Sequence, residues 1–254
     1  MSLSPEQNAS LDNLGYVNLG PVLSPEDLAM IRREYDLLVV AEKQTLGNDK
    51  DGKFPYRAML NFRSDPLREI ICRPNLVRLA IERLGPDIRF WWDQGINKSP
   101  GSGSHIDWHQ DNGYQRGQVP EYLTFWLALD DSDRDNGGLL VIPGSHRMGQ
   151  RKHELQDVHW VIPDVDTSTA VALNAKAGDL LLFSSLLVHK TVGNHSTDRQ
   201  RRAWVIQYAK ADATNAEDGT SYEDRPWVAK DGVVLESLLV EKPFDLSQNS
   251  HNAG

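Results

Sequence analysis

The sequence predicts a mostly β domain with flanking helices, and three observations support this prediction. Residues before about 86 contain two helical patterns that carry start or stop signals. Residues from 88 onward contain several short runs rich in branched and aromatic side chains. Clusters of glycine, proline, asparagine and aspartate separate those runs. Helices that precede a series of short strands are typical of helices packed against a β-sandwich or barrel.

Capping and stop signals place the two helices. Ser24 can cap the first helix, and Pro25 suits its first helical position. The apolar positions that follow at helical spacing are Leu28, Ile31, Tyr35 and Leu38. A second helix is expected over residues 74–84, because its leucines share one face and Gly85-Pro86 then ends it.

The strands are expected at residues 88–98, 122–130, 139–143, 179–191 and 202–210. We expect a single domain over residues 1–254, with helical support at about 20–86 and a β core at about 88–210. A C-terminal extension covers residues 211–254; it is polar and irregular from Asn215 until residues 232–240. Residues 247–254 are expected to be disordered.

Composition excludes several classes of protein. The chain has a net charge of −9 and no basic run, so neither nucleic acid nor a membrane is an expected partner. No apolar run approaches the ~20 residues needed to span a bilayer, and the N-terminus lacks the features of a signal peptide. Cys72 is the only cysteine, and its apolar neighbours favour a buried core position. We expect a cytoplasmic monomer or homodimer that acts on a small molecule.

The chemistry is indicated by two overlapping copies of one motif. His105/Asp107 and His109/Asp111 are both His-x-Asp pairs within eight residues of sequence. On an extended strand, residues two apart point to the same side, so either pair can offer an imidazole and a carboxylate to one metal ion. A second histidine from elsewhere would complete a 2-His-1-carboxylate triad, which leaves open positions on iron(II).

His189 is the strongest candidate for the distant histidine. It ends the apolar run 180–188, so we expect a buried strand to carry it to the edge of a cavity. His195 lies in a polar loop and His146 follows a Gly-Ser turn, which favours solvated and structural roles. The residues alone do not decide which His-x-Asp pair binds the metal.

The order of these motifs is more specific than any one of them. The ordered segments are Gly15–Val17 with Val22–Glu26, then Trp108–Asp111, Leu123–Asp130, Asn136–His146, His189 and Arg201–Ala203. Over residues 10–210 this set resembles the phytanoyl-CoA dioxygenase family of iron(II)- and 2-oxoglutarate-dependent oxygenases. The resemblance implies a double-stranded β-helix, that is, a jelly-roll or cupin-like core.

The resemblance also implies roles for particular residues. The metal ligands fall on His109, Asp111 and His189, which would be the catalytic centre. The far carboxylate of 2-oxoglutarate falls on Arg201, whose planar fork suits a carboxylate. The other positions implied to line the co-substrate pocket are Gln94, Trp126 and Thr191.

Two departures from the family pattern affect these assignments. The loop after His189 is one residue longer than usual, so Arg199, Arg201 and Arg202 compete for the carboxylate. Strand alternation groups Arg201 with Ala203, Val205 and Gln207 on the less bulky face, which favours Arg201. Lys190 stands where the family often has glycine, which alters the rim of the pocket.

The implied reaction hydroxylates an unactivated C–H bond of a small metabolite or natural-product intermediate, and converts 2-oxoglutarate and O₂ to succinate and CO₂. Asp111 supplies the carboxylate that related halogenases lack, which argues against halogenation. Desaturation, epoxidation, cyclisation, a non-oxygenase metal-dependent cupin and a binding protein that has lost catalysis remain alternatives. The residues expected to contact substrate at the pocket mouth are His105, Asp107, Asn112, Tyr114, Trp92 and Arg57.

Overall fold

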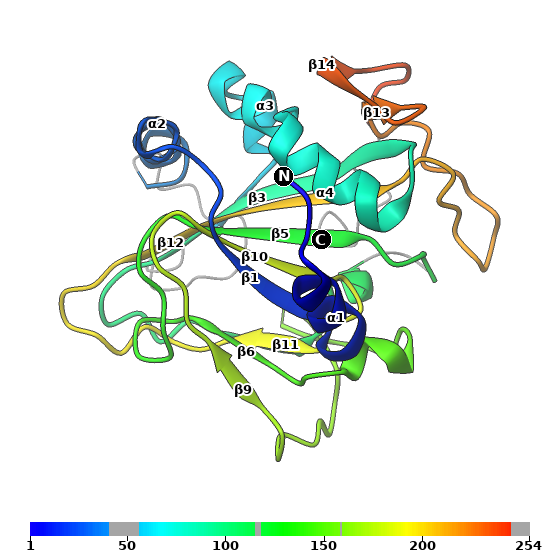
Figure 1. Cartoon of the computed structure of the whole chain (residues 1–254). Coiled ribbons are helices and arrows are strands. Elements are labelled where there is room, and N and C mark those ends of the chain that lie inside the picture. The colour runs from blue at the N-terminus through cyan, green and yellow to red at the C-terminus, as the bar shows by residue number, and fades with distance from the viewer. Residues whose placement is uncertain (41–55, 115–117, 158, 245–254) are drawn as a thin grey trace.

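Two antiparallel sheets face each other and form the centre of the molecule. The structure, a computed structural model, describes residues 1–40, 56–114, 118–157 and 159–244 (Figure 1). The major sheet has the order β1 (Tyr16–Pro21), β10 (Asp179–Ser184), β5 (Leu123–Ala128), β12 (Arg201–Lys210), β3 (Ile88–Lys98), β13 (Trp227–Lys230) and β14 (Val233–Leu239), with β2 (Tyr56–Ala58) also paired to β3. The minor sheet has the order β4 (Ile106–His109), β11 (His189–Thr191), β6 (Leu139–Val141) and β9 (Val171–Leu173). β7 (Glu154–Gln156) and β8 (His159–Val161) form a separate two-stranded sheet, and β8 contacts β4 of the minor sheet. The predicted mostly β fold with a jelly-roll core is confirmed.

The two faces of the major sheet bury different cores, because side chains alternate along each strand. Trp126 and Ala203 point between the sheets, where they join a cluster that also contains side chains of the minor sheet. Trp204 and Phe125, one position along, point the other way into a larger core shared with the helices. This alternation confirms that Arg201 lies on the inward face of β12 and Arg202 on the face toward the helices.

The helices are α1 (Pro5–Leu14), α2 (Pro25–Tyr35), α3 (Asp65–Ile71) and α4 (Pro74–Leu84), and Figure 1 shows α3 and α4 over the major sheet. A π-helical turn η1 (Asp36–Val40) continues α2, and short 3₁₀ turns lie at η2 (Leu60–Phe62), η3 (Asp111–Tyr114) and η4 (Ser145–Met148). The two predicted helices are confirmed, and Ser24 caps α2 by accepting a hydrogen bond from the Asp27 amide. Among the described residues, no helix is long and apolar enough to cross a membrane.

Several predictions about elements were wrong or incomplete. α1 was not predicted, although Ser4 and Gln7 form a complete capping box at its start. Cys72 is buried as expected, at the end of the unpredicted helix α3. In the C-terminal extension, expected to be irregular up to 232, β13 joins the major sheet beside β3. The disorder expected for residues 247–254 falls outside the described residues.

The predicted strand over residues 179–191 is in fact two strands in different sheets. β10 pairs with β5 in the major sheet, whereas β11 pairs with β4 and β6 in the minor sheet. Between them the chain turns at Ser184, whose carbonyl accepts a hydrogen bond from the Leu187 amide. The continuous apolar run concealed this crossing, because both strands and the turn are buried. His189 therefore begins the short strand β11 instead of ending a long one.

Candidate metal and co-substrate site

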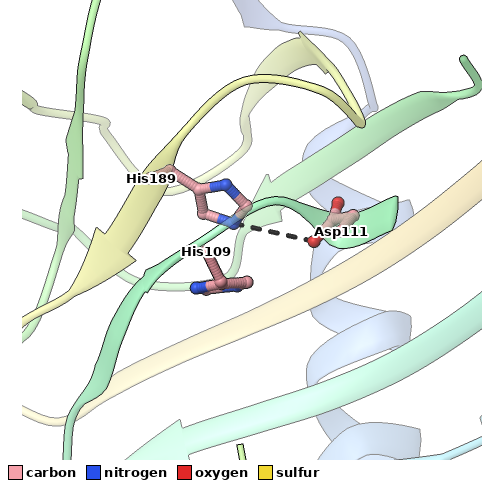
Figure 2. Close-up of side chains that lie close together, drawn as sticks. All are labelled: His109, Asp111 and His189. Atoms are coloured by element: carbon pink, nitrogen blue, oxygen red, sulfur yellow. Dashed lines mark ion pairs between the residues drawn. The ribbon is translucent and has the colours of Figure 1, made fainter. Parts of the chain in front are cut away.

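His109, Asp111 and His189 come together between the sheets. One possible ligand atom from each lies within 4.8 Å of the other two, and this is the only such group of three in the described part of the chain. Figure 2 shows both imidazole rings and the carboxylate turned toward one another, with His189 Nε2 at 3.6 Å from Asp111 Oδ1. The pairing of β4 with β11 places His109 directly opposite His189, and this register brings the two rings together.

Main-chain carbonyls orient both histidine rings. His109 Nδ1 lies 2.7 Å from the carbonyl oxygen of Asp107, and His189 Nδ1 lies 2.9 Å from that of Leu187. Because a carbonyl oxygen only accepts, each Nδ1 must carry a hydrogen, which leaves Nε2 as the nitrogen of each ring that can bind a metal ion. Burial, reinforced by His189, holds the pKa of His109 well below its usual value. A neutral imidazole with a free Nε2 is the form that binds a metal ion.

Asp111 reaches the site from a helical turn, which corrects the expectation that strand alternation brings the pair together. β4 ends at His109, and Asp111 is the first residue of η3. Its Oδ2 accepts hydrogen bonds from Thr124 Oγ1 at 2.5 Å and from Gln207 Nε2 at 3.0 Å, which leaves Oδ1 facing His189. These contacts of Thr124 and Gln207 were not predicted, although strand alternation with Trp126 and Arg201 places both residues on the inward face.

Gln110 lies between the two candidate ligands, and hydrogen bonds hold both its backbone and its side chain. Its amide donates to His153 Nε2 at 3.0 Å, and its side chain bonds main-chain groups of Gly149, Arg151 and Leu186. His153, for which the sequence showed no pattern, thereby fixes the backbone of the His-x-Asp segment.

The first copy of the motif, His105/Asp107, is turned away from the site. Strand alternation alone would give it the orientation of the second copy, but the pairing of β4 with β11 shifts register between His189 and Thr191 and breaks the alternation. The shift puts Ile106 in the core between the sheets and leaves Asp107 beside Lys190 Nζ, at 3.3 Å. His105 is exposed, and its Nε2 lies 4.0 Å from Asp107.

Arg201 is a fully buried cation whose hydrogen-bonding capacity is mostly unused. Its Nη2 donates to the carbonyl of Gly137 at 2.7 Å, but its Nε and Nη1 have no partner among the described residues. The guanidinium carbon lies 5.7 Å from the centre of the Trp126 ring, and burial lowers the pKa of Arg201 to about 10. Buried donors without acceptors are rare and unfavourable in a folded protein, so this arrangement fits an anionic ligand such as a carboxylate.

The two competing arginines are already paired. Arg199 forms a salt bridge with Asp133 on the surface. Arg202 binds Asp130 through two nitrogens and also contacts Asp36. Neither guanidinium faces the space between the sheets, which leaves Arg201 as the buried arginine available to a ligand.

The other residues expected near the co-substrate differ in their surroundings. Trp126 is buried on the inward face of β5. Thr191 accepts hydrogen bonds from Lys98 Nζ at 2.8 Å and from the Ile106 amide at 3.3 Å. Gln94 accepts one from Trp92 Nε1 at 3.0 Å. Lys98, for which no role was predicted, is the register partner of Arg201.

The residues expected to contact substrate do not form one group. Tyr114 packs its ring edge-on against His109, with centroids 5.5 Å apart, and its hydroxyl lies 3.2 Å from His159. Asn112 is fully buried and donates to the carbonyl of Val119, so it ties η3 to the chain before β5. Arg57 is buried on β2 and donates to the carbonyl of Leu38.

A jelly roll with two histidines, a carboxylate and an unsatisfied buried arginine between its sheets fits iron(II) and a dicarboxylate. These features define a non-haem oxygenase that uses iron(II), 2-oxoglutarate and O₂. The sequence profile of the phytanoyl-CoA dioxygenase (PhyH) family matches residues 11–203, and the chain belongs to that family. The non-oxygenase cupin is thereby excluded.

Individual relatives are distant. A probable alpha-ketoglutarate-dependent hypophosphite dioxygenase of Stutzerimonas stutzeri is 25% identical over 229 residues, covering 82% of this chain and 79% of that protein. The crystal structure of EvdO2 from Micromonospora carbonacea var. aurantiaca with 2-oxoglutarate has a TM-score of 0.73 at 23% identity, over 86% of this chain and 95% of that one. SnoK, an alpha-ketoglutarate-dependent carbocyclase from nogalamycin biosynthesis, has a TM-score of 0.71 at 25% identity, over 94% and 97%.

Proposed function

We propose that this enzyme hydroxylates an unactivated C–H bond of a small metabolite or natural-product intermediate, with His109, Asp111 and His189 as the iron ligands. The observation that carries the proposal is the unsatisfied guanidinium of Arg201 between the same two sheets. It supports a co-substrate that brings a carboxylate to Arg201 while its other end reaches the metal. Trp126 and Thr191 would line that co-substrate, and Gln94 would complete the pocket.

Each residue has a distinct task in this proposal. The two Nε2 atoms and Asp111 Oδ1 would occupy three positions around the ion, since hydrogen bonds hold their other polar atoms. When bound, the iron with 2-oxoglutarate and O₂ supplies the oxidative decarboxylation to succinate and CO₂ and the oxidation of the substrate. Arg201 would orient the co-substrate through its far carboxylate, and the buried walls would exclude water.

Oxidative ring closure is a second candidate. The similarity to SnoK, described as a carbocyclase, favours it over desaturation or epoxidation. Hydroxylation and ring closure need the same ligands and the same co-substrate, so they differ only in how the substrate is held. A product from an authentic substrate therefore decides between them: hydroxylation adds one oxygen atom to it, whereas ring closure removes two hydrogens.

The proposed function is tested by anaerobic binding and aerobic turnover. Iron(II)-loaded protein is titrated with 2-oxoglutarate without O₂, and succinate is then measured after O₂ is admitted, with and without a panel of small substrates. We expect binding, slow succinate formation alone and faster formation with a substrate. Failure of the iron-loaded protein to bind 2-oxoglutarate would contradict the proposal. The control is Arg199→Met, which removes a surface guanidinium that is paired with Asp133.

A further inference from the structure

One row of side chains crosses three strands of the major sheet at the candidate metal site. Thr124 on β5 is the register partner of Gln207 on β12, and Gln207 is that of Trp92 on β3. Thr124 and Gln207 both donate hydrogen bonds to Asp111 Oδ2. Trp92 Nε1 donates to Gln94, two positions along β3 and so on the same face. Trp92 is therefore the next member of the row that holds a candidate iron ligand.

This row lies at the opposite end of β12 from Arg201. Gln207 and Arg201 are six positions apart on that strand, roughly 20 Å along an extended chain. A co-substrate that runs from Arg201 to the metal lies along the part of β12 between them. The substrate has to reach the metal without displacing the co-substrate. The metal end of the sheet, where Trp92 lies, is therefore the part of the core that is left to the substrate.

The C-terminal extension reaches this end of the sheet through residues 241–244, the C-terminal strap. Glu241 accepts a hydrogen bond from Lys230 Nζ at 2.7 Å, and Lys242 forms an ion pair with Glu223. Lys230 belongs to β13, and Glu223 lies in the loop before it. These contacts fix the course of the strap, so its last residue is held in a defined place.

Phe244, the last residue of the strap, packs near Trp92. Their ring centroids are 6.3 Å apart with an angle of 43° between the planes, and Phe62 meets Phe244 edge-on at 5.7 Å. The guanidinium carbon of Arg225 lies 4.0 Å from the centre of the Phe244 ring. Trp92 is 4% exposed and joins the larger core, whereas Phe244 is only partly buried against that core. Phe244 is therefore the outer member of an aromatic pair at the metal end of the sheet.

We propose that Phe244 is a specificity-determining residue, and that Phe244 and Trp92 form an apolar wall for a ring-bearing part of the substrate. Aromatic rings offer their faces and edges to flat apolar groups, so the substrate class is a molecule with an apolar ring. The inference rests on the proposed function, because it assumes a substrate that meets a metal at Asp111. The strap lies beyond residue 203, where the match to the PhyH profile ends, so the family pattern does not include this wall.

The test uses indole, a neutral ring compound, as a probe of the wall. Manganese(II) replaces iron in the full chain, because it is paramagnetic and accepts nitrogen and oxygen ligands. With 2-oxoglutarate present, the metal shortens the relaxation times of indole protons that bind close to it, relative to zinc(II)-loaded protein. We expect a saturable effect with the wild type. Phe244→Ala should bind indole about 3- to 10-fold more weakly, the usual effect of losing one aromatic contact.

Three further variants separate the ring of Phe244 from the fold. Phe244→Tyr keeps the ring and should bind indole like the wild type. Phe244→Leu keeps an apolar side chain without the ring. It should lose affinity in the same direction as Phe244→Ala, and it covers the case in which the alanine variant does not fold. Val240→Ala is the matched control, because Val240 is an apolar residue of the same extension that is 56% exposed, and it should bind indole like the wild type.

Two results would overturn the inference. One is a wild type that binds manganese(II) and 2-oxoglutarate but has no paramagnetic effect on indole. The other is unchanged indole affinity in both Phe244→Ala and Phe244→Leu, and a lower melting temperature of these variants would then assign Phe244 only the anchoring of the extension. A wild type that binds neither the metal nor 2-oxoglutarate would sink the proposed function as well, which distinguishes that failure from a failure at Phe244 alone.

Discussion

Thr124 donates its hydroxyl hydrogen to Asp111 Oδ2, across the space between β5 and the turn η3, with the oxygens 2.5 Å apart. Gln207 donates to the same oxygen at 3.0 Å and to Thr124 Oγ1 at 3.2 Å. Two strands of the major sheet therefore hold one oxygen of a carboxylate that the His-x-Asp segment supplies. The other oxygen, Oδ1, is left toward His189.

We expect Thr124→Val to weaken iron(II) binding by about 10- to 100-fold, the usual effect of removing a partner that orients a metal ligand. The substitution keeps the shape of the side chain but leaves Gln207 as the remaining hydrogen-bond donor to Asp111 Oδ2 among the described residues. Thr124→Ser retains the hydroxyl and should bind metal nearly as well as the wild type. Competition titration with a metal-sensitive dye measures both affinities, and equal affinities for the two variants would contradict the orienting role.

Substitutions in the two copies of the His-x-Asp motif should have opposite effects on iron(II) binding. His109→Ala, Asp111→Ala or His189→Ala each removes one of three donors and should abolish stoichiometric iron(II) binding. His105→Ala should leave iron binding unchanged, because His105 is exposed and its ring lies beside Asp107, which is turned away from the three candidate ligands. Metal content after anaerobic loading and desalting decides the matter. Retention of iron in His109→Ala, with loss in His105→Ala, would reverse the assignment.

Substitutions at the two neighbouring arginines of β12 should have different effects, one on co-substrate binding and the other on stability. Arg201→Met should raise the KM for 2-oxoglutarate about 100-fold, because it removes a buried charged partner of the carboxylate. Arg202→Met should leave that KM within a few-fold, but lower the melting temperature, since Asp130 and Asp36 lose their shared guanidinium. Steady-state kinetics and thermal unfolding of both variants test this, and the reverse pattern would assign the carboxylate to Arg202.

Because of Asp93, the free energy of unfolding should fall as the pH rises from about 4 to about 6. Burial raises its pKa to about 6, although Asn61 and Trp204 donate hydrogen bonds to it. The folded protein therefore keeps this proton at pH values where the unfolded chain has lost it, so unfolding becomes easier as pH rises through this window. Asp93→Asn removes the titration, and its free energy of unfolding relative to the wild type should rise by up to about 3 kcal/mol from pH 4 to pH 7. Denaturant unfolding at several pH values measures it; a constant difference would contradict the assignment.

Much of the fold could be predicted from local patterns. The start of α2 at Ser24-Pro25 and the whole of β3 were predicted from capping and composition. Alternation along β12 correctly separated Arg201 from Arg202, because the two-residue period of a strand is a property of the backbone itself. The residue types of the candidate metal site could also be predicted, because the His-x-Asp pair and the later histidine are features of the sequence itself.

What the sequence by itself determined is which groups are present and which face of a regular strand carries them. Only the tertiary structure decided which groups meet. The register shift in β4 turned Asp107 outward, the turn after Ser184 moved His189 into the minor sheet, and the pairing of β3 with β12 put Lys98 beside Arg201. Each of these depends on hydrogen bonds between segments far apart in the chain. A local sequence pattern specifies neither the partner strand nor the register of the pairing.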